Sequence, residues 1–434
     1  MIDPQTSPKS YIKLLALVAV LGLISALITF AFVTLVHQGT NLIWEKIPVA
    51  LNIDPRLSII AICTAGGLLV GLLVKRFGDH SGIFAEMMLE FGKTGRFDYR
   101  NAPGIVMTAF VSLISGASLG PEAPLADACG SLGTLLSDRL RLNEQETRTM
   151  GYSGISGMLA AFITSPFGGA LLGLESAQGG TGGLLAYFWI LFPSLLASSV
   201  ATVVFVALKG SFFETLYRFP SYTPQLTDLI YAAPLGLLGG VVGLLFMASL
   251  NRLRRLFQPM KERLVLRGLV GGLGMGIIGA FLPLTLFSGE AETADLISHS
   301  AEIGVAMLIV LGIAKLFATS LLLATGWKGG YIFPIMFAGV AMGLAVSLLI
   351  PDIPAAVAVA ATMAGALVSA LRTPLFAALF TATLVQKETG AAIAVAIVVS
   401  ALLMAILALR AARRAKRDAA PAAETAAATE ESSS

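Results

Sequence analysis

Glu122 stands at a position where a carboxylate needs an explanation. The stretch SLGPEAPL, Ser118–Leu125, places it between Pro121 and Pro124, within sequence that is apolar from Gly104 onward. A charged side chain at the centre of a bilayer costs about 2.5–3.5 kcal/mol even on lenient insertion scales. Other groups in the chain must therefore stabilise this charge or make use of it.

Glycine and proline around Glu122 indicate the start of a helix, and Gly330–Pro334 has the same character. A helix N-terminus presents unpaired N–H groups and about +0.5 of an elementary charge, and proline suits its first turn. Two such ends that converge would bind an anion loosely enough to release it. Glu122 would then be a tethered anion that competes for the site until protonation releases it. The alternative is a structural carboxylate held by neighbouring backbone N–H groups.

The composition predicts an all-α polytopic membrane protein. Hydrophobic residues make up 56% of the 434 residues and charged residues only 13%, whereas a soluble domain has about 25% charged residues. Several apolar stretches are shorter than the roughly 20 residues of a full span and contain glycine or proline. Interrupted helices are tolerated in a membrane only where they pack within protein or line a polar cavity. The two cysteines and three histidines lack ligand spacing, so we expect no metal and no cofactor.

Two motifs occur twice along the chain at a nearly constant offset. Gly120 and Gly330 begin one pair, 210 residues apart, and Gly157 and Gly365 begin the other, 208 residues apart. The full sets are Gly120, Pro124 and Gly133 with Gly330, Pro334 and Gly343, and Gly157 and Pro166 with Gly365 and Pro374. Two halves of about 200 residues suggest inverted-topology repeats, whose substrate site lies near the midplane between discontinuous helices.

Basic residues predict how the chain crosses the membrane. Six lie in Arg252–Arg267 and five in Leu409–Arg417, while the segment Lys209–Asp228 holds two. The positive-inside rule then places both termini of this multi-pass cell-membrane protein in the cytoplasm. We expect no nucleic-acid partner, because these charges serve topology. The predicted segments are an N-terminus 1–13, a first repeat 14–208, an external linker 209–228, a second repeat 229–410, and a basic, then disordered tail 411–434.

Two motifs invite an enzyme interpretation and do not support it. Gly116–Gly120 fits the G-x-S-x-G pattern of hydrolases, but no strand precedes it and His299 is the only later histidine. Gly274–Gly279 fits the dinucleotide pattern G-x-G-x-x-G, yet it lies mid-membrane without a βαβ unit. Close helix packing by small residues explains it better. We expect no enzyme activity.

Three motifs together resemble the CLC family of chloride channels and chloride/proton exchangers. GPEAP at Gly120–Pro124 is similar to the family's G-[KR]-E-G-P, HSGIF at His80–Phe84 to G-S-G-I-P, and GYIFP at Gly330–Pro334 to G-x-F-x-P. Gly151–Glu175 is similar to the family's Ala/Gly-rich helix and the run that follows it. The resemblance covers about residues 12–410 in order and spacing.

The resemblance implies a CLC-like fold of two inverted repeats and a role for each matching residue. Glu122 matches the external gating glutamate, and Ser81 matches a serine whose hydroxyl faces the central chloride. A homodimer in which each subunit has its own chloride pathway is also implied. The anion-binding positions implied are Ser81, Gly82, Gly120, Ala123, Gly330, Tyr331 and Ile332.

Departures from the family pattern bear on proton coupling. Ser176 falls on the internal proton-transfer glutamate, and serine cannot exchange a proton near neutral pH. Glu175, its neighbour, is a candidate for a proton path, or alternatively a carboxylate that caps or bridges helices. No tyrosine after Ala408 matches the family's pore tyrosine. We therefore expect passive, channel-like chloride transport; the alternative is a proton-coupled chloride antiporter or a carrier of another small anion.

Overall fold

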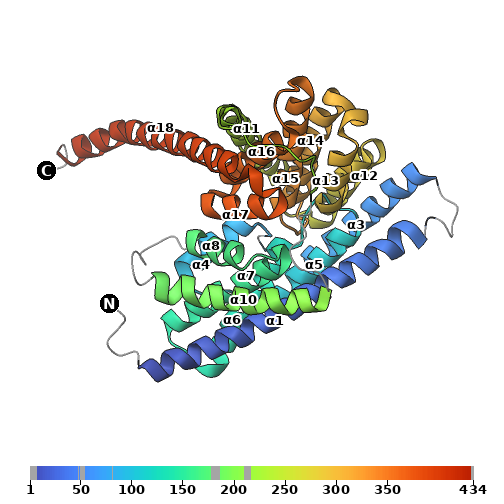
Figure 1. Cartoon of the computed structure of the whole chain (residues 1–434). Coiled ribbons are helices and arrows are strands. Elements are labelled where there is room, and N and C mark those ends of the chain that lie inside the picture. Colours follow the sequence, from blue (N-terminus) through green and yellow to red (C-terminus); the bar gives the residue numbers. More distant parts are fainter. Residues whose placement is uncertain are drawn as a thin grey trace.

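The computed structural model describes residues 7–46, 48, 54–80, 82–176, 186–209 and 217–431. Every regular element within these ranges is a helix, and eight of the helices are long and apolar enough to cross a membrane. The predicted all-α membrane fold is therefore confirmed. Figure 1 shows the first half of the chain packed below the second half in that view.

The helices fall into two successive series. The first series is α1 (Pro8–Asn41), η1 (Leu42–Lys46), α3 (Pro55–Phe77), α4 (Phe84–Thr94), α5 (Ala102–Ile114), α6 (Glu122–Leu140), α7 (Glu144–Ile163), α8 (Pro166–Ser176), η2 (Tyr187–Leu191) and α10 (Phe192–Lys209). The second is α11 (Leu226–Phe257), η3 (Gln258–Met260), α12 (Leu264–Phe281), η4 (Pro283–Thr285), α13 (Glu290–Ser298), α14 (Ser300–Ala324), α15 (Ile332–Leu349), α16 (Ala355–Leu371), α17 (Pro374–Leu384), η5 (Lys387–Thr389) and α18 (Gly390–Glu431).

The two series pack by the same rule. In the first, α7 contacts α6, α8, α1 and α10; in the second, α16 contacts α15, α17, α11 and α18. Likewise, α3 packs on α5 as α12 packs on α14. These matching contacts are those expected of the two repeats that the glycine and proline motifs predict.

Glycines allow α3 and α12, one from each half, to approach closely. A side chain at Gly67 would meet the backbone around Gly268, and a Cβ at Gly276 would lie 2.9 Å from the Cα of Ile60. Gly276 belongs to the G-x-G-x-x-G stretch, so close helix packing accounts for that motif.

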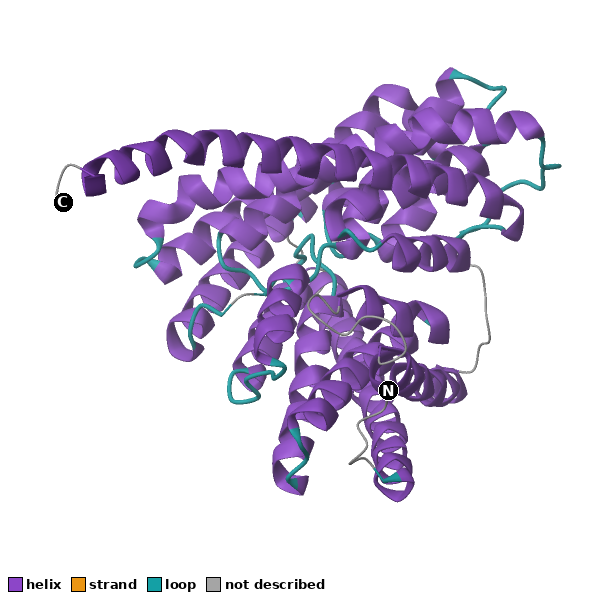
Figure 2. Ribbon diagram, turned by 90° about the vertical axis from the view of Figure 1, so that its left-hand side faces the viewer, coloured by secondary structure: helices purple, strands orange, loops and turns teal. Residues whose placement is uncertain are grey.

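Loops gather where the two halves meet. Figure 2 shows them converging between the upper and lower groups of helices. Proline helps to start several helices at these breaks: Pro166 begins α8 and Pro374 begins α17, where the missing N–H costs nothing. These two short helices contact each other across the two halves, and their N-terminal N–H groups are available to a side chain or a ligand.

The C-terminal segment belongs to the last helix in the described part of the chain. The alanine-rich stretch within 411–434, expected to be disordered, continues α18 as helix to Glu431. Alanine has the highest helix propensity, and compositional rules for disorder do not weigh this local preference. Figure 1 shows α18 reaching well beyond the other helices, with the C-terminus at its far end.

Candidate anion-binding site

Gly120 and Gly330 join the two halves at their centre. The N–H of Gly120 donates to the carbonyl of Gly330 at 2.9 Å, and the N–H of Gly330 donates to the carbonyl of Gly120 at 2.6 Å. They form an isolated antiparallel bridge, and they are the residues that the 210-residue offset pairs in the sequence. The structure thus brings together the two predicted helix starts, α6 and α15.

The carboxylate of Glu122 lies at the N-terminus of α15, in the other half of the chain. Its side chain is buried, with 1% exposed, and Oε1 accepts the N–H of Ile332 at 2.8 Å. Oε2 has no hydrogen-bond partner among the described residues. A Cβ added to Gly120 or Gly330 would collide with this carboxylate. The two glycines therefore leave the space that the carboxylate occupies.

Ala123 follows Glu122 in the chain, and Tyr331 precedes Ile332, the residue that donates to the Glu122 carboxylate. Ala123 is buried in the first turn of α6, and Tyr331 directly precedes α15. The ring of Tyr331 packs on Phe246 of α11, with ring centroids 5.0 Å apart. Its buried hydroxyl has no partner among the described residues, an arrangement that costs about 1–3 kcal/mol. This hydroxyl is a donor that an anion could use.

The loop before α4 contains the predicted serine ligand and Gly82. Ser81 lies outside the described residues. Gly82, the next residue, is in the loop before α4, where an added Cβ would approach Cδ of Lys328 to 2.8 Å. Gly82 therefore lies beside the segment that leads to Gly330 and α15.

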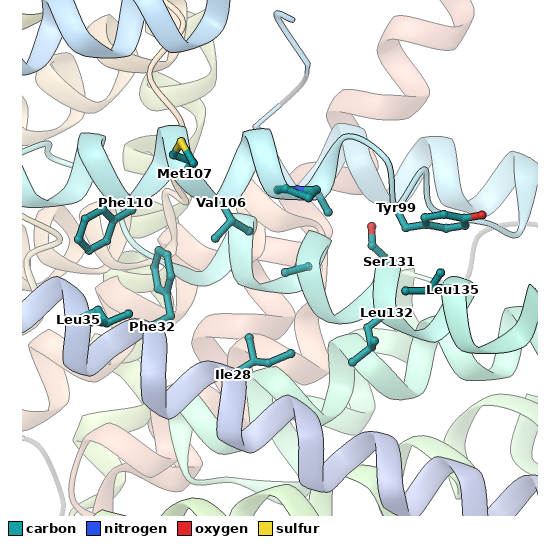
Figure 3. Close-up of a pocket in the computed structure, with 13 residues that line it drawn as sticks. Ile28, Phe32, Leu35, Tyr99, Val106, Met107, Phe110, Ser131, Leu132 and Leu135 are labelled. Atoms are coloured by element: carbon teal, nitrogen blue, oxygen red, sulfur yellow. The ribbon is translucent and has the colours of Figure 1, made fainter. Parts of the chain in front are cut away.

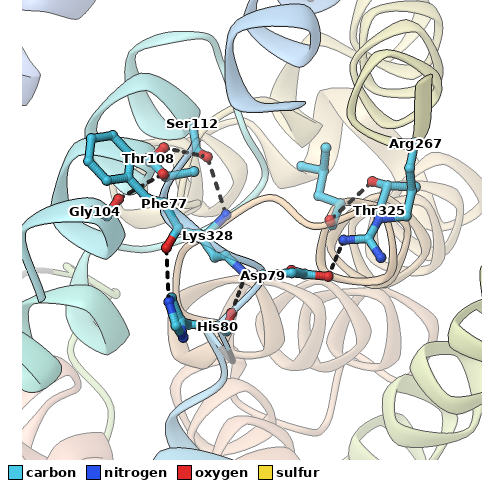
Figure 4. Close-up of polar contacts among 10 residues, drawn as sticks. Phe77, Asp79, His80, Gly104, Thr108, Ser112, Arg267, Thr325 and Lys328 are labelled. Atoms are coloured by element: carbon cyan, nitrogen blue, oxygen red, sulfur yellow. Dashed lines mark hydrogen bonds and ion pairs between the residues drawn. The ribbon is translucent and has the colours of Figure 1, made fainter. Parts of the chain in front are cut away.

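An ion cluster of the half-exposed Asp79 with the buried Lys328 and Arg267 ties these two loops together (Figure 4). Nζ of Lys328 donates to Oδ1 of Asp79 at 3.1 Å and to the carbonyl of His80, while Arg267 pairs with Oδ2 of Asp79. Lys328 is 4% exposed and Arg267 7%. Two cations facing one carboxylate leave a positive excess at the edge of a cavity of about 360 Å³. Such an excess attracts anions.

Glu175 has partners at a different helix start. Its Oε1 accepts the N–H of Leu375 at 2.7 Å, and its Oε2 accepts the N–H of Phe376 at 2.8 Å. Both donors belong to the first turn of α17. The contact is a cap between two helices, and a proton path through Glu175 stays a prediction. The side chain of Ser176 lies outside the described part of the chain.

A buried lysine and an apolar cavity lie elsewhere in the structure. Lys315 is fully buried, and its Nζ donates to the carbonyls of Thr285, Leu286 and Phe287 at 3.1, 2.9 and 2.8 Å. Its charge therefore stabilises a turn. A cavity of about 570 Å³ between α1, α5 and α6 is lined mainly by apolar side chains, Phe32 and Phe110 among them (Figure 3).

Comparison with known proteins agrees with this architecture. The family model described as voltage gated chloride channel matches residues 66–405. Broken helices that meet in the middle of a multi-span bundle, together with this match, define a membrane anion transporter. The chain belongs to the voltage gated chloride channel (CLC) family. The resemblance found in the sequence motifs is therefore confirmed.

Individual relatives extend over most of the chain. The protein named "Putative ion-transport protein YfeO" of Escherichia coli K12 is 28% identical over 340 residues, 76% of this chain and 78% of that protein. A cyanobacterial Cl⁻/H⁺ antiporter has the same fold, with a TM-score of 0.78, 21% identity, and coverage of 90% of this chain and 94% of its own. A CLC-type fluoride/proton antiporter gives a TM-score of 0.74 and 19% identity, covering 92% and 97%.

Proposed function

We propose that this chain carries chloride, or a related halide, through a pathway that the carboxylate of Glu122 closes. One observation carries the proposal: a buried carboxylate from α6 occupies the N-terminus of α15, where Ile332 donates its N–H. A side chain that already occupies a donor position suited to an anion competes with any diffusible anion for that position.

Protonation of Glu122, or displacement by an anion, would free this N-terminus. The passing anion would then be held by backbone N–H groups and by the hydroxyl of Tyr331, which has no other partner among the described residues. Partial charges bind an anion weakly enough for it to leave again. The buried cations Lys328 and Arg267 would raise the local concentration of anions near the pathway.

Of the two forms of transport, the residues of this chain favour passive movement of chloride over proton-coupled exchange. Ser176 stands where proton-coupled relatives are expected to have a glutamate, and the carboxylate of Glu175 is engaged by two backbone N–H groups. Proton-coupled exchange is the second candidate, favoured by the descriptions of two proteins of the same fold as Cl⁻/H⁺ and fluoride/proton antiporters.

Purified protein in liposomes tests both forms. We expect Glu122→Gln to retain or raise chloride flux and to remove its pH dependence, because an amide cannot gain or lose the charge. Glu262→Gln, an exposed carboxylate in the loop before α12, is the matched control and leaves both properties unchanged. Abolished flux in a folded Glu122→Gln protein contradicts the gate role.

A pH electrode in the same liposomes separates channel from exchanger. Passive movement predicts no stoichiometric proton flow against a chloride gradient, and stoichiometric flow establishes the exchanger.

We further propose a homodimer, one pathway per subunit, which cross-linking at low protein density in liposomes would detect.

A further inference from the structure

We propose that the N-terminus of α17 is a second binding site for a small inorganic anion, and that the side chain of Glu175 occupies this site when no anion is present. The ligand is taken to be of the transported class, and in that respect the inference rests on the proposed function. The site is separate from the one at α15.

The contacts of Glu175 define the donors. Pro374, the first residue of α17, has no N–H, and the next two residues, Leu375 and Phe376, direct theirs to the two carboxylate oxygens at 2.7 and 2.8 Å. The N–H of Ala377 is already used by the carbonyl of Thr373. The two donors held by Glu175 are therefore the ones at this helix start that an anion would need.

Two unpaired hydroxyl groups line the cavity next to these donors, and one of them, that of Thr373, lies at this helix start. Thr373, the residue before α17, is 5% exposed, and Ser369 of α16 is 2% exposed. Neither Oγ1 of Thr373 nor Oγ of Ser369 has a hydrogen-bond partner among the described residues. Oγ of Ser369 faces α11, 3.2 Å from a Cβ built at Gly240. The unpaired hydroxyl at the start of α17 is therefore that of Thr373, and because buried hydroxyls are normally paired, it leaves a donor for a bound group.

The space at this position also suits an anion. Thr373, Ser369 and Glu175 line one cavity of about 410 Å³, together with Arg372 and with Glu86, which pairs with Arg254. The cavity extends to Phe84, the first residue of α4, whose preceding loop contains the predicted ligands Ser81 and Gly82. An anion at α17 would thus lie in a cavity that reaches toward the central site.

The arrangement parallels that of Glu122. In each case a glutamate from the first half accepts backbone N–H groups at the start of a helix in the second half, α15 for Glu122 and α17 for Glu175. Removing either side chain exposes the N–H groups of that helix. Two helix starts that can each hold an anion would give the pathway successive stations.

Structure determination in bromide tests the second site directly. We expect the double variant Glu122→Ala/Glu175→Ala, in which neither helix start keeps a side-chain acceptor, to show bromide anomalous density in contact with the N–H groups of Leu375 and Phe376. In the control Glu122→Ala/Glu175→Gln, the amide oxygen of residue 175 still accepts one of these N–H groups, so we expect at least a several-fold lower bromide occupancy at α17. Adding Thr373→Val to the alanine variant is expected to weaken bromide binding several-fold.

The possible results separate the two proposals. Bromide beside Ile332 but absent at α17 overturns the second site and leaves the proposed function standing. Bromide at α17 but absent beside Ile332 overturns the proposed function and leaves the second site standing. If Glu175→Ala does not fold, Glu175→Asp withdraws the carboxylate by one methylene and uncovers at least one N–H. Absence of bromide at α17 in a folded aspartate variant then counts against the second site.

Discussion

Gly330 matters because of what it lacks. The three atoms nearest to an added Cβ at this position all belong to the side chain of Glu122, and the same holds for Gly120. Substitution would therefore disturb the carboxylate before it disturbed the fold. A glutamate side chain can rotate to another rotamer at modest cost. The two backbone hydrogen bonds between the glycines have no such alternative, so the side chain is the group that moves.

We predict that Gly330→Ala expels the carboxylate from α15 and behaves like Glu122→Gln. Chloride flux should persist and lose most of its pH dependence, because the titrating group no longer occupies the pathway. Chloride efflux between pH 5 and 8 measures this. Gly390→Ala, where an added Cβ meets nothing within 4 Å, is the control. Unchanged pH dependence in Gly330→Ala would show that the glutamate position is unimportant.

Residue types explain which parts of the site could be predicted. Gly120–Pro124 and Gly330–Pro334 stand out because glycine and proline break helices at matching places in two repeats. The ion pair of Asp79 with Lys328 joins residues 249 apart, and an isolated lysine gives no sign of its partner. The one indication in the sequence that Lys328 belongs to the site is its position two residues before Gly330.

At the level of elements, the ion cluster at Asp79 fixes how two loops meet. The loop after α3 and the loop before α15 contribute Asp79 and Lys328, and α12 contributes Arg267. Lys328 is buried while the side chain of Asp79 is 34% exposed, so separating the pair is costly mainly because it leaves a buried ammonium group without its partner. The relative position of the Gly82 and Gly330 loops therefore depends on these three side chains.

We predict that Lys328→Met lowers chloride flux roughly tenfold. Losing hydrogen bonds to a charged group costs about 1.5–3 kcal/mol, and every 1.4 kcal/mol lost from the arrangement of the two loops makes that arrangement about tenfold less populated. The loss should remain at every pH, because Glu122 itself is untouched. Lys261→Met is the matched control, since Lys261 lines the same cavity and is exposed. Flux of Lys328→Met equal to that of the control would exclude a role in the pathway.

For the whole molecule, hydropathy and repeats were sufficient to predict the class of fold. Long apolar segments and the constant offset gave the helical bundle and its two halves, because both follow from composition and spacing. The course of α18 beyond residue 410 was not predicted, because low hydropathy with many charges describes both disorder and an exposed helix. Contacts between individual side chains of the two halves were likewise not predicted from composition and spacing.

Orientation in the membrane is the prediction that belongs to this scale. We predict that Lys261→Cys is labelled by a membrane-impermeant maleimide only from the cytoplasmic side, because Arg252–Arg267 is strongly basic. The native cysteines, Cys63 and Cys129, are both buried and give a low background. Labelling of intact cells before lysis would reverse the proposed topology.

The bridge between Gly120 and Gly330 has a mechanical consequence. Any rocking of one half against the other would have to separate two main-chain hydrogen bonds beside the passing ion. Swinging a single glutamate needs no such separation, and side-chain rotations are far faster than the motion of whole domains. If Glu122 is the gate that we propose, the frame can stay rigid during transport, and we expect the turnover rate to depend on this one acidic group and not on the scaffold.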